Sequence, residues 1–427
     1  MIPLSTTMYR ESEEKGSVNV FVPADILLPQ LEDMGKWAVV ACDQFTSQPD
    51  YWRGVRETVG AAPSALELIL PEVELSGSYE QRIPAIHAAM ARYLTEGLFR
   101  ECPVSFVYVE RRLLDGKIRP GLVGAVDLEQ YDYSADAVSA VRATERTVVE
   151  RIPPRQKVRR GASLELPHVL LLCDDPEDRI LAPLAAVKER LPLLYDFELM
   201  QGGGPIKGWL VQGEEAQLVQ QRLAAYEAEG RERCGHESAM LYAVGDGNHS
   251  LATAKACWEE QKRTLSPEQW AAHPARFALV ELENLYDDSQ QIEPIHRIVT
   301  RVDAAALLEA ARTQICADGG FPVPWVSGGD SGVLFLDPAK GQLPVGILQN
   351  FLDAYLAAKG GEIDYIHDDE ALRALAARPG AVGFLLPAIG KEQLFRGIIA
   401  DGVLPRKTFS MGHAVEKRYY LEARKIV

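Results

Sequence analysis

The residues best suited to chemistry lie in one polar turn between two apolar segments, at positions 245–250. The glycines allow a ligand to approach the backbone closely, and the carboxylate of Asp246 could hold a metal ion. His249 could donate a hydrogen bond to an oxyanion or move a proton. An alternative that needs no ligand is a turn in which Asn248 or Ser250 caps the next helix. The turn consists of Gly245, Asp246, Gly247, Asn248, His249 and Ser250.

The segments that flank this turn predict a strand and a helix. Residues 240–244 are apolar, which is typical of a buried strand. Residues 251–262 place Leu251, Ala254 and Trp258 on one face of a helix. A strand, a glycine-containing turn and a helix start direct backbone N–H groups toward whatever lies above the turn. The arrangement therefore favours an anion such as phosphate.

A second polar concentration covers residues 142–160. Glu145 lies beside arginines, which would keep it ionised as a general base requires. Arginine forks suit carboxylate or phosphate, and the paired prolines at 153 and 154 stiffen the segment. The alternative is a solvated basic segment that answers nearby acids. The candidate anion-binding residues of this stretch are Arg142, Thr144, Arg151 and Arg155, with Lys157, Arg159 and Arg160 as further cations.

Three glycines at 202–204 precede a lysine and form a third candidate. They could make a flexible anion-binding nest with Lys207 as its cation. The spacing differs from that of a P-loop, because the terminal Lys-Ser/Thr pair is missing. A β-hairpin loop between residues 194–200 and 209–211 explains the glycines equally well.

Polar residues also follow other predicted strands, where α/β proteins commonly place ligands. The strand predicted at 37–42 leads into Asp43, Gln44, Thr46 and Ser47. These could line a site, or Ser47 could only cap the following helix. His168 could be a site residue or a hydrogen-bonded core histidine, and the basic tail offers Lys407 as a further anion-binding residue.

The bulk properties favour a two-lobed protein of the cytoplasm. A chain of 427 residues is too long for one small core, and a net charge of −16 argues against nucleic-acid or anionic-membrane binding. Six separated cysteines suit reduced thiols, and no apolar segment is typical of a signal peptide or a membrane span. Antiparallel pairs such as 104–111 with 120–128 occur among helices. We therefore expect a mixed α+β fold with mixed sheets, lobes at 1–235 and 236–427, and a polar cleft between them.

Several motifs together resemble a widespread prokaryotic family known as domain of unknown function 1015. They occur in the family's order along nearly the whole chain. They are WAVVACDQFTS, RATERTVVERIPPR, ELPH, LYDFELMQGGG, AVGDGNHSLATAK, EPIHR, DYIH and PRKTFSMGHA.

The central turn also resembles the phosphate-binding loop of the ParB/sulfiredoxin-like superfamily. Most of the family carries Asp-Gly-His-His-Arg there, and this chain keeps Asp246, Gly247 and His249 but has Asn248 and Ser250. Some superfamily members are free-serine kinases that use ADP or ATP, so the resemblance implies a phosphotransferase. Serine in place of the arginine removes a bidentate phosphate contact, which other basic residues would have to replace.

From these observations we predict a small-molecule phosphotransferase, such as a free-serine kinase using ATP, ADP or pyrophosphate. Asp246 would hold Mg²⁺, the turn would bind phosphates, and Glu145 and His249 would be the catalytic residues. The expected partner is a small anionic metabolite. Two alternatives stay open, namely a non-catalytic anion- or nucleotide-binding regulatory protein and a metal-dependent hydrolase.

Overall fold

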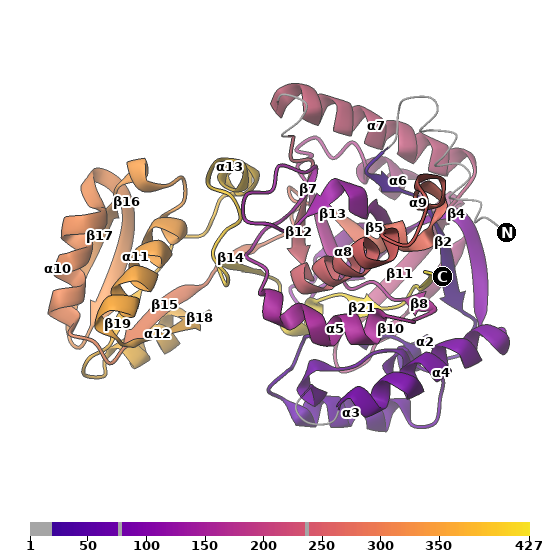
Figure 1. The fold of residues 1–427 in the computed structure, drawn as a ribbon, viewed down its shortest axis with the longest axis horizontal. Helices are drawn as coiled ribbons and strands as arrows, with labels where there is room; N and C mark the ends of the chain where they lie inside the picture. The colour runs from indigo at the N-terminus through magenta and orange to yellow at the C-terminus, as the bar shows by residue number, and fades with distance from the viewer. Residues whose placement is uncertain (1–18, 76–78, 235–238) are drawn as a thin grey trace. The chain divides into compact units, whose positions relative to one another are not determined.

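The computed structural model describes residues 19–75, 79–234 and 239–427, which form two compact units (Figure 1). Unit 2 consists of residues 144–146 and 291–412, and unit 1 of the remaining described residues. The units differ from the lobes predicted at 1–235 and 236–427, because unit 1 draws on both. The predicted boundary itself lies next to residues outside the described ones.

Unit 1 is built on an 11-stranded mixed sheet. The strand pairs β9–β13, β7–β12 and β6–β7 are parallel and the others are antiparallel. Such a mixed sheet with helices confirms the predicted α+β class. The strand order is β10 (Leu193–Leu199), β11 (Gly204–Val211), β4 (Phe99–Arg112), β5 (Ile118–Asp127), β13 (Phe277–Asn284), β9 (Leu170–Cys173), β12 (Tyr242–Asp246), β7 (Val141–Ala143) and β6 (Tyr131–Asp132), with β1 (Phe21–Val22) beside β5 and β2 (Ala24–Pro29) beside β4.

Successive side chains along the strands point to opposite faces of this sheet, and each face is covered by a separate apolar core. On β13, Phe277 and Leu279 belong to one core, whereas Val280 and Leu282 belong to the other. The first core includes residues of α3 (Pro49–Val59) and α4 (Ile83–Thr95). The second includes residues of α7 (Glu214–Cys234), α8 (Asn248–Lys262) and α6 (Ala182–Val187).

Three local predictions near the site are corrected by the structure. Trp37 ends the short helix α2 (Met34–Trp37) instead of starting a strand, and β3 is only Val39–Val40. Gln48, not Ser47, precedes α3 at its N-cap position. The basic segment forms the helix α5 (Ile152–Arg159). Proline is tolerated in its first turn because the N–H groups of a first turn have no hydrogen-bond acceptor within the helix, so the N–H that proline lacks is not missed.

The last described residues, 413–427, run through unit 1 after the chain has completed unit 2. Strand β21 (Tyr419–Tyr420) pairs with β3, and β22 (Arg424–Lys425) pairs with β8 (Leu164–Glu165). Tyr419, Tyr420 and Leu421 are buried in the first core. This segment therefore brings side chains to the site from a distant part of the sequence.

Unit 2 contains a 5-stranded sheet in the order β17, β16, β19, β15, β18. These strands are Asp330–Leu336, Cys316–Ser327, Val382–Phe384, His296–Thr300 and Glu362–Ile366. A two-stranded ribbon joins β14 (Ile292–Pro294) to β20 (Phe409–Met411). The helices of unit 2 are α10 (Ala304–Ile315), α11 (Pro344–Lys359), α12 (Asp369–Ala376) and α13 (Lys391–Asp401). The short helix α9 (Pro267–Ala272), which precedes them in the sequence, belongs to unit 1.

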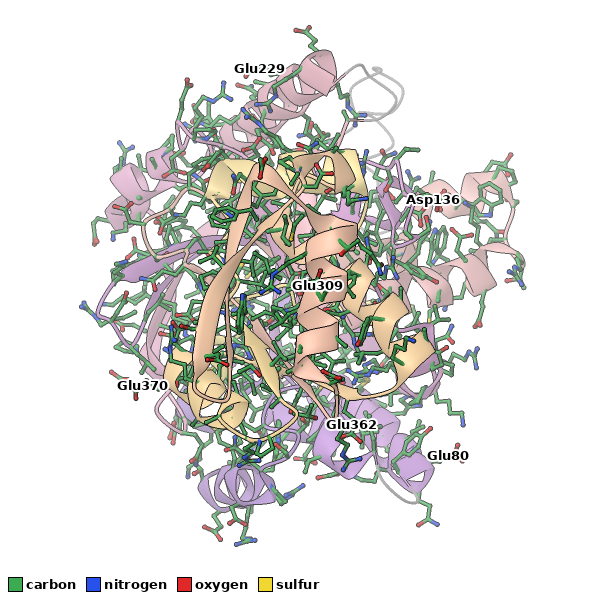
Figure 2. The ribbon with its side chains drawn as sticks, turned by 90° about the vertical axis from the view of Figure 1, so that its left-hand side faces the viewer. Glu80, Asp136, Glu229, Glu309, Glu362 and Glu370 are labelled. Carbon is green, nitrogen blue, oxygen red and sulfur yellow. The ribbon has the colours of Figure 1, made fainter. Side chains whose placement is uncertain are left out.

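Exposed carboxylates occur on both units and fit the acidic composition. Those labelled in Figure 2 are Glu80, Asp136 and Glu229 of unit 1 and Glu309, Glu362 and Glu370 of unit 2. Within the described residues, the helices are too short or too polar to span a membrane.

Candidate functional site

The predicted polar turn joins β12 to α8 in unit 1. Gly247 is the N-cap of α8 and adopts a left-handed conformation with φ 80°, so the prediction that Asn248 or Ser250 caps the helix is wrong. A Cβ at Gly247 would lie 3.1 Å from the Cα atom of Val169 and 3.3 Å from the His168 ring. Glycine is needed here both for backbone conformation and for this close approach.

Asp246 ends β12 and faces a cation from the C-terminal segment. Its Oδ2 atom lies 3.4 Å from Nζ of Lys417, and both side chains are largely buried. This partner could not be predicted from local patterns, because Lys417 lies 171 residues further along the chain. The carboxylate of Asp246 and the ammonium of Lys417 thus stand at the start of α8.

His249 projects from the first turn of α8 and is bonded to the chain before α5. Its Nε2 accepts a hydrogen bond of 3.2 Å from the N–H of Val148, so we assign the ring proton to Nδ1. Burial and the positive charges of Arg155 and Arg151 lower the pKa of His249 to about 4, against the opposing effect of Asp43. The neutral ring is suited to donate a hydrogen bond at pH 7, not to transfer protons.

His249 is expected to make stability fall as the pH drops below about 6.5. The folded-state pKa is lowered to about 4, so the unfolded chain, with an ordinary pKa near 6.5, takes up the proton first. The contribution is complete above that ordinary pKa and lost as the pH falls toward 4. Wild type should lose roughly 2 kcal/mol more than His249→Gln between pH 7 and pH 5 in urea unfolding. Equal losses in both proteins would contradict the assignment.

A pocket of about 140 Å³ lies beside the first two turns of α8, entirely within unit 1. Much of its lining is apolar and comes from the segment before α4, from α4, from α5 and from the residues that follow α5. The apolar lining includes Leu68, Leu70, Met90, Val158, Ala162 and Leu166. Its polar residues include Arg155, His168, Ser250, Thr253 and Tyr420.

The polar part of the pocket is held by hydrogen bonds across the sequence. Nδ1 of His168 and the hydroxyl of Tyr420 are 2.6 Å apart. His168 is therefore a hydrogen-bonded buried residue that also lines the pocket, so both interpretations of it from the sequence apply. Cys42 also lines the pocket, but burial raises the pKa of its thiol to about 11, so it is not a ready nucleophile.

Asp43 adds a second carboxylate to this part of unit 1. Burial tends to raise its pKa, but interaction with His168, a 3.0 Å hydrogen bond from Gln44 and the charge of Lys417 together lower it. Asp43 is thus ionised at neutral pH. Its position directly after the predicted strand was the signal for it, although sequence reasoning did not place it among the catalytic residues.

The cations of α5 are mostly neutralised by acids of unit 1. Arg151 is exposed and forms no ion pair with a described residue. The other four cations form ion pairs with nearby acids, as the alternative interpretation of this segment predicts. The pairs are Arg155 with Glu72, Lys157 with Glu80, Arg159 with Glu165 at 2.6 Å, and Arg160 with Glu260 at 2.6 Å.

Three other predicted anion-binding residues lie in structural positions. Lys207 is within β11 and pairs with Asp196 of β10 at 2.8 Å, so the three glycines form the hairpin loop of the alternative interpretation. Arg142 is buried on β7, where its Nε donates to the carbonyl of Ser139 at 2.9 Å. The buried Thr144 accepts at its carbonyl a 2.9 Å hydrogen bond from Leu404.

Glu145 and Lys407 belong to unit 2, whereas Asp246 and His249 belong to unit 1. The two oxygens of Glu145 accept hydrogen bonds from the N–H groups of Lys407 and Thr408, each 3.0 Å long. Burial raises the pKa of Glu145 in spite of these bonds. Its predicted role as a base stays a prediction.

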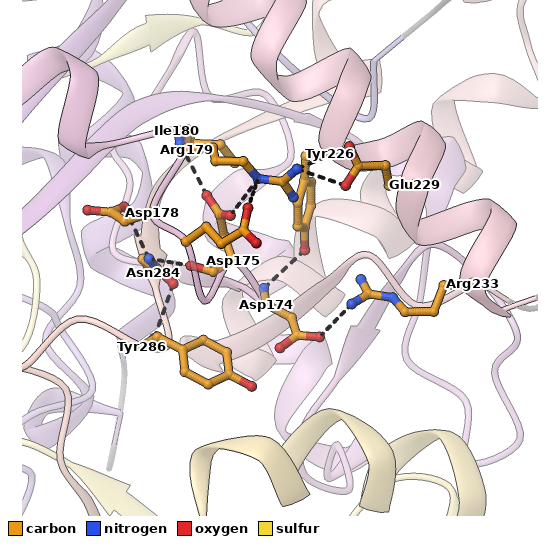
Figure 3. Close-up of polar contacts among 11 residues, drawn as sticks. Asp174, Asp175, Asp178, Arg179, Ile180, Tyr226, Glu229, Arg233, Asn284 and Tyr286 are labelled. Carbon is orange, nitrogen blue, oxygen red and sulfur yellow. Dashed lines mark hydrogen bonds and ion pairs between the residues drawn. The ribbon is translucent and has the colours of Figure 1, made fainter.

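The polar residues after β9 and β13 form a separate network, shown in Figure 3. Nδ2 of Asn284 donates to the carbonyl of Asp175 at 2.9 Å and to Oδ1 of Asp178 at 3.1 Å. Arg179 joins Asp175 to Glu229, at 3.3 and 2.8 Å. These contacts satisfy one another and give the segment a structural role.

The fit of a magnesium ion rests on Asp246. Across the described ranges, no three His, Cys, Asp or Glu side chains are grouped as a metal site would require. The chain alone therefore offers no metal cage, but Mg²⁺ is often held by one carboxylate together with substrate phosphates and water. Asp246 fits that lesser requirement, with Lys417 as its present partner.

A buried ion network, absent from the sequence predictions, supports the first core. Arg418 lies 2.9 Å from Glu281 and also pairs with Glu422, while Arg119 lies 2.9 Å from Glu283. The hydroxyl of Tyr195 donates to Glu422 at 2.6 Å. Room for Glu281 comes from the absence of a side chain at Gly121, where a Cβ would collide with it. The two glutamates of β13 alternate with the apolar residues of its other face.

The fold and the site define a class of α+β proteins in which a strand, a glycine turn and a helix lie beside a pocket. The chain belongs to the family described as protein of unknown function DUF1015, whose sequence profile matches residues 23–423. No curated protein matches the sequence.

Solved structures resemble the fold only distantly. A mutant of free serine kinase in complex with ADP is 13% identical, with a TM-score of 0.37 over 71% of this chain and 91% of that chain. A conserved hypothetical protein from Pyrococcus furiosus has 13% identity and a TM-score of 0.32, covering 70% and 90%. C-terminally truncated SbnI from Staphylococcus aureus has 10% identity and a TM-score of 0.35, covering 68% and 82%.

Proposed function

We propose that this protein transfers a phosphoryl group from a nucleotide to a small hydroxylated metabolite that carries a carboxylate, such as serine. The observation that carries the proposal is the pocket beside the first two turns of α8. Its position next to the turn would let one ligand place an apolar ring in the pocket and its phosphates at the helix start. The apolar lining favours a nucleotide over pyrophosphate as the donor, because pyrophosphate has no group to fill it.

In this proposal the residues of the turn bind and orient the phosphates. Backbone N–H groups of Gly247 and His249 and the Nδ1–H of His249 would donate to phosphate oxygens, and Lys417 would offset their charge. A magnesium ion, when bound with the nucleotide, would take Asp246 as its protein ligand and neutralise phosphate charge. Residues of the chain then have mainly to position the reactants.

The proton acceptor for the metabolite hydroxyl is a carboxylate, and we assign this role to Asp43. It is ionised and lies in unit 1, near His168 and Lys417. Glu145 was the base predicted from the sequence, and its oxygens are engaged by backbone N–H groups in unit 2. Comparing Asp43→Asn with Glu145→Gln tests the assignment: loss of turnover in the first variant alone supports it, and loss in the second alone restores the original prediction.

The pocket is tested by filling it. Wild type should transfer phosphate to serine, or to another hydroxylated acceptor in a panel, from ATP or ADP, as read by phosphorus NMR. Val158→Trp should raise the KM for the nucleotide at least about tenfold, since the added ring would compete with the base. Val138→Trp, an identical change at an exposed position, is the matched control.

The outcomes of this assay separate the possible functions. Nucleotide binding that Val158→Trp weakens, with no transfer to any acceptor, would indicate the non-catalytic regulatory protein. Transfer from pyrophosphate that is insensitive to Val158→Trp would remove the nucleotide from the proposal. No thermal shift with any nucleotide would contradict a nucleotide site in unit 1. The metal-dependent hydrolase gains no support from the side chains described.

A further inference from the structure

Unit 2 presents two adjacent cations on the loop 404–408. Arg406 and Lys407 are exposed, and neither forms an ion pair with a residue that the structure describes. This contrasts with α5, where nearly every cation has an acidic partner. In a chain with a net charge of −16, two neighbouring cations without an ion pair are a local exception, although the carboxylate of Glu145 interacts electrostatically with Lys407. Such an exception is how an acidic protein can attract an anion.

The backbone of this loop is held on several sides. Lys407 has a left-handed φ of 58°, which costs energy in a residue with a side chain. Both carboxylate oxygens of Glu145 accept hydrogen bonds from backbone N–H groups, one from Lys407 and one from Thr408. The hydroxyl of Thr408 donates to the carbonyl of Pro405 at 2.6 Å. The loop therefore presents its two cations from a fixed backbone.

A third cation, Arg297, lies buried beneath the loop. Its Nη1 donates to the carbonyl of Lys407 at 2.8 Å and its Nε to Oε1 of Gln349 at 2.9 Å. Its Nη2 has no hydrogen-bond partner among the described residues, although the side chain is fully buried. A buried guanidinium nitrogen without an acceptor is costly.

The ring of Tyr365 connects the buried and the exposed arginines. The guanidinium carbon of Arg297 lies 4.9 Å from the ring centroid, and that of Arg406 lies 5.6 Å from it. Both distances are within the range of cation–π attraction. Four segments that are far apart in sequence thus meet in unit 2, namely 144–146, 295–297, 364–367 and 404–408.

We propose that loop 404–408 is a binding site for the oxyanion of a small molecule, a carboxylate or a phosphate. Arg406 and Lys407 contact the anion directly, and the buried Arg297 adds positive potential from beneath the loop. The site is independent of the phosphotransferase proposal, since it needs only unit 2 residues and makes no use of the turn in unit 1. Failure of the nucleotide assays would leave it unaffected.

The test is a calorimetric titration of the full chain with inorganic phosphate and, separately, with malonate at low ionic strength. The double variant Arg406→Ala/Lys407→Ala should weaken binding at least about tenfold, the scale of one lost charge-assisted hydrogen bond. Lys359→Ala, at an exposed lysine elsewhere in unit 2, removes a cation without touching the loop and should change binding less than about twofold.

Each result decides between stated possibilities. Weaker binding of phosphate alone, or of malonate alone, in the double variant supports the site and identifies its preferred anion. Equal weakening by Lys359→Ala would show general charge attraction and overturn the proposal. Unchanged affinities in the double variant, or no binding of either anion to wild type, would also overturn it. Circular dichroism checks that each variant is folded.

Discussion

Replacing Arg418 by methionine is expected to lower the free energy of unfolding by about 3–5 kcal/mol. The guanidinium pairs with Glu281 and Glu422, and all three side chains are almost completely buried. Removing the cation would leave two carboxylates in the core of unit 1 without their counterion. Desolvated charges without a partner are among the costliest defects that one substitution can create.

Urea unfolding of Arg418→Met against wild type measures this loss. The matched control is Arg53→Met, because Arg53 pairs with Asp50 at 2.6 Å on the surface and both side chains are well exposed. That control should change stability by less than about 0.5 kcal/mol. A triple variant that also replaces Glu281 and Glu422 by leucine should recover part of the loss. Similar effects of Arg418→Met and Arg53→Met would contradict the role of the buried network.

Changing Asp246 to asparagine is expected to reduce phosphoryl transfer by at least about 100-fold, while the protein stays folded. The variant keeps the shape of the side chain but removes the charge that faces Lys417 and, in the proposed function, a magnesium ion. The carboxylate lies at the end of β12, and its contact with Lys417 is long at 3.4 Å, so the free energy of unfolding should fall by only about 1–3 kcal/mol.

The measurement compares turnover, nucleotide affinity and melting temperature in the same preparation. Asp50→Asn, at the exposed start of α3, is a control that also removes one carboxylate. Weaker magnesium dependence of nucleotide binding in Asp246→Asn alone would support the assignment. Full activity in that variant would remove Asp246 from the site, and a failure to fold would show that its contact with Lys417 is mainly structural.

Local sequence patterns predicted many of the elements and the central turn. The β12 strand and α8 were predicted within a few residues, because a continuous apolar run and helical spacing are both local patterns. The hairpin of β10 and β11 was one of two open interpretations of the three glycines. Helix α5 was not predicted, because the paired prolines indicate only a stiff segment, although proline is compatible with a first helical turn.

The surroundings of the turn could not be predicted, because their partners are far apart in sequence. Lys417 contacts Asp246, and Tyr420 contacts His168. Both partners lie on residues 413–427, which belong to unit 1 but follow unit 2 in the sequence. The acids that neutralise α5 come from residues 72, 80, 165 and 260. A single sequence shows which charged residues are present, but it does not show which acidic residue forms an ion pair with which basic residue.

The position of residues 413–427 within unit 1 has a consequence for how the chain folds during synthesis. Unit 2 is inserted in the sequence between the sheet of unit 1 and the segment that supplies Tyr419, Tyr420 and Leu421 to its core. While the ribosome makes residues 291–412, this core lacks the side chains of residues 419–421, and the carboxylate of Glu281 lacks its partner Arg418. Unit 2 has all but its short segment 144–146 in one continuous stretch. It can complete its fold first, and unit 1 would be the part of the nascent chain that depends on chaperones.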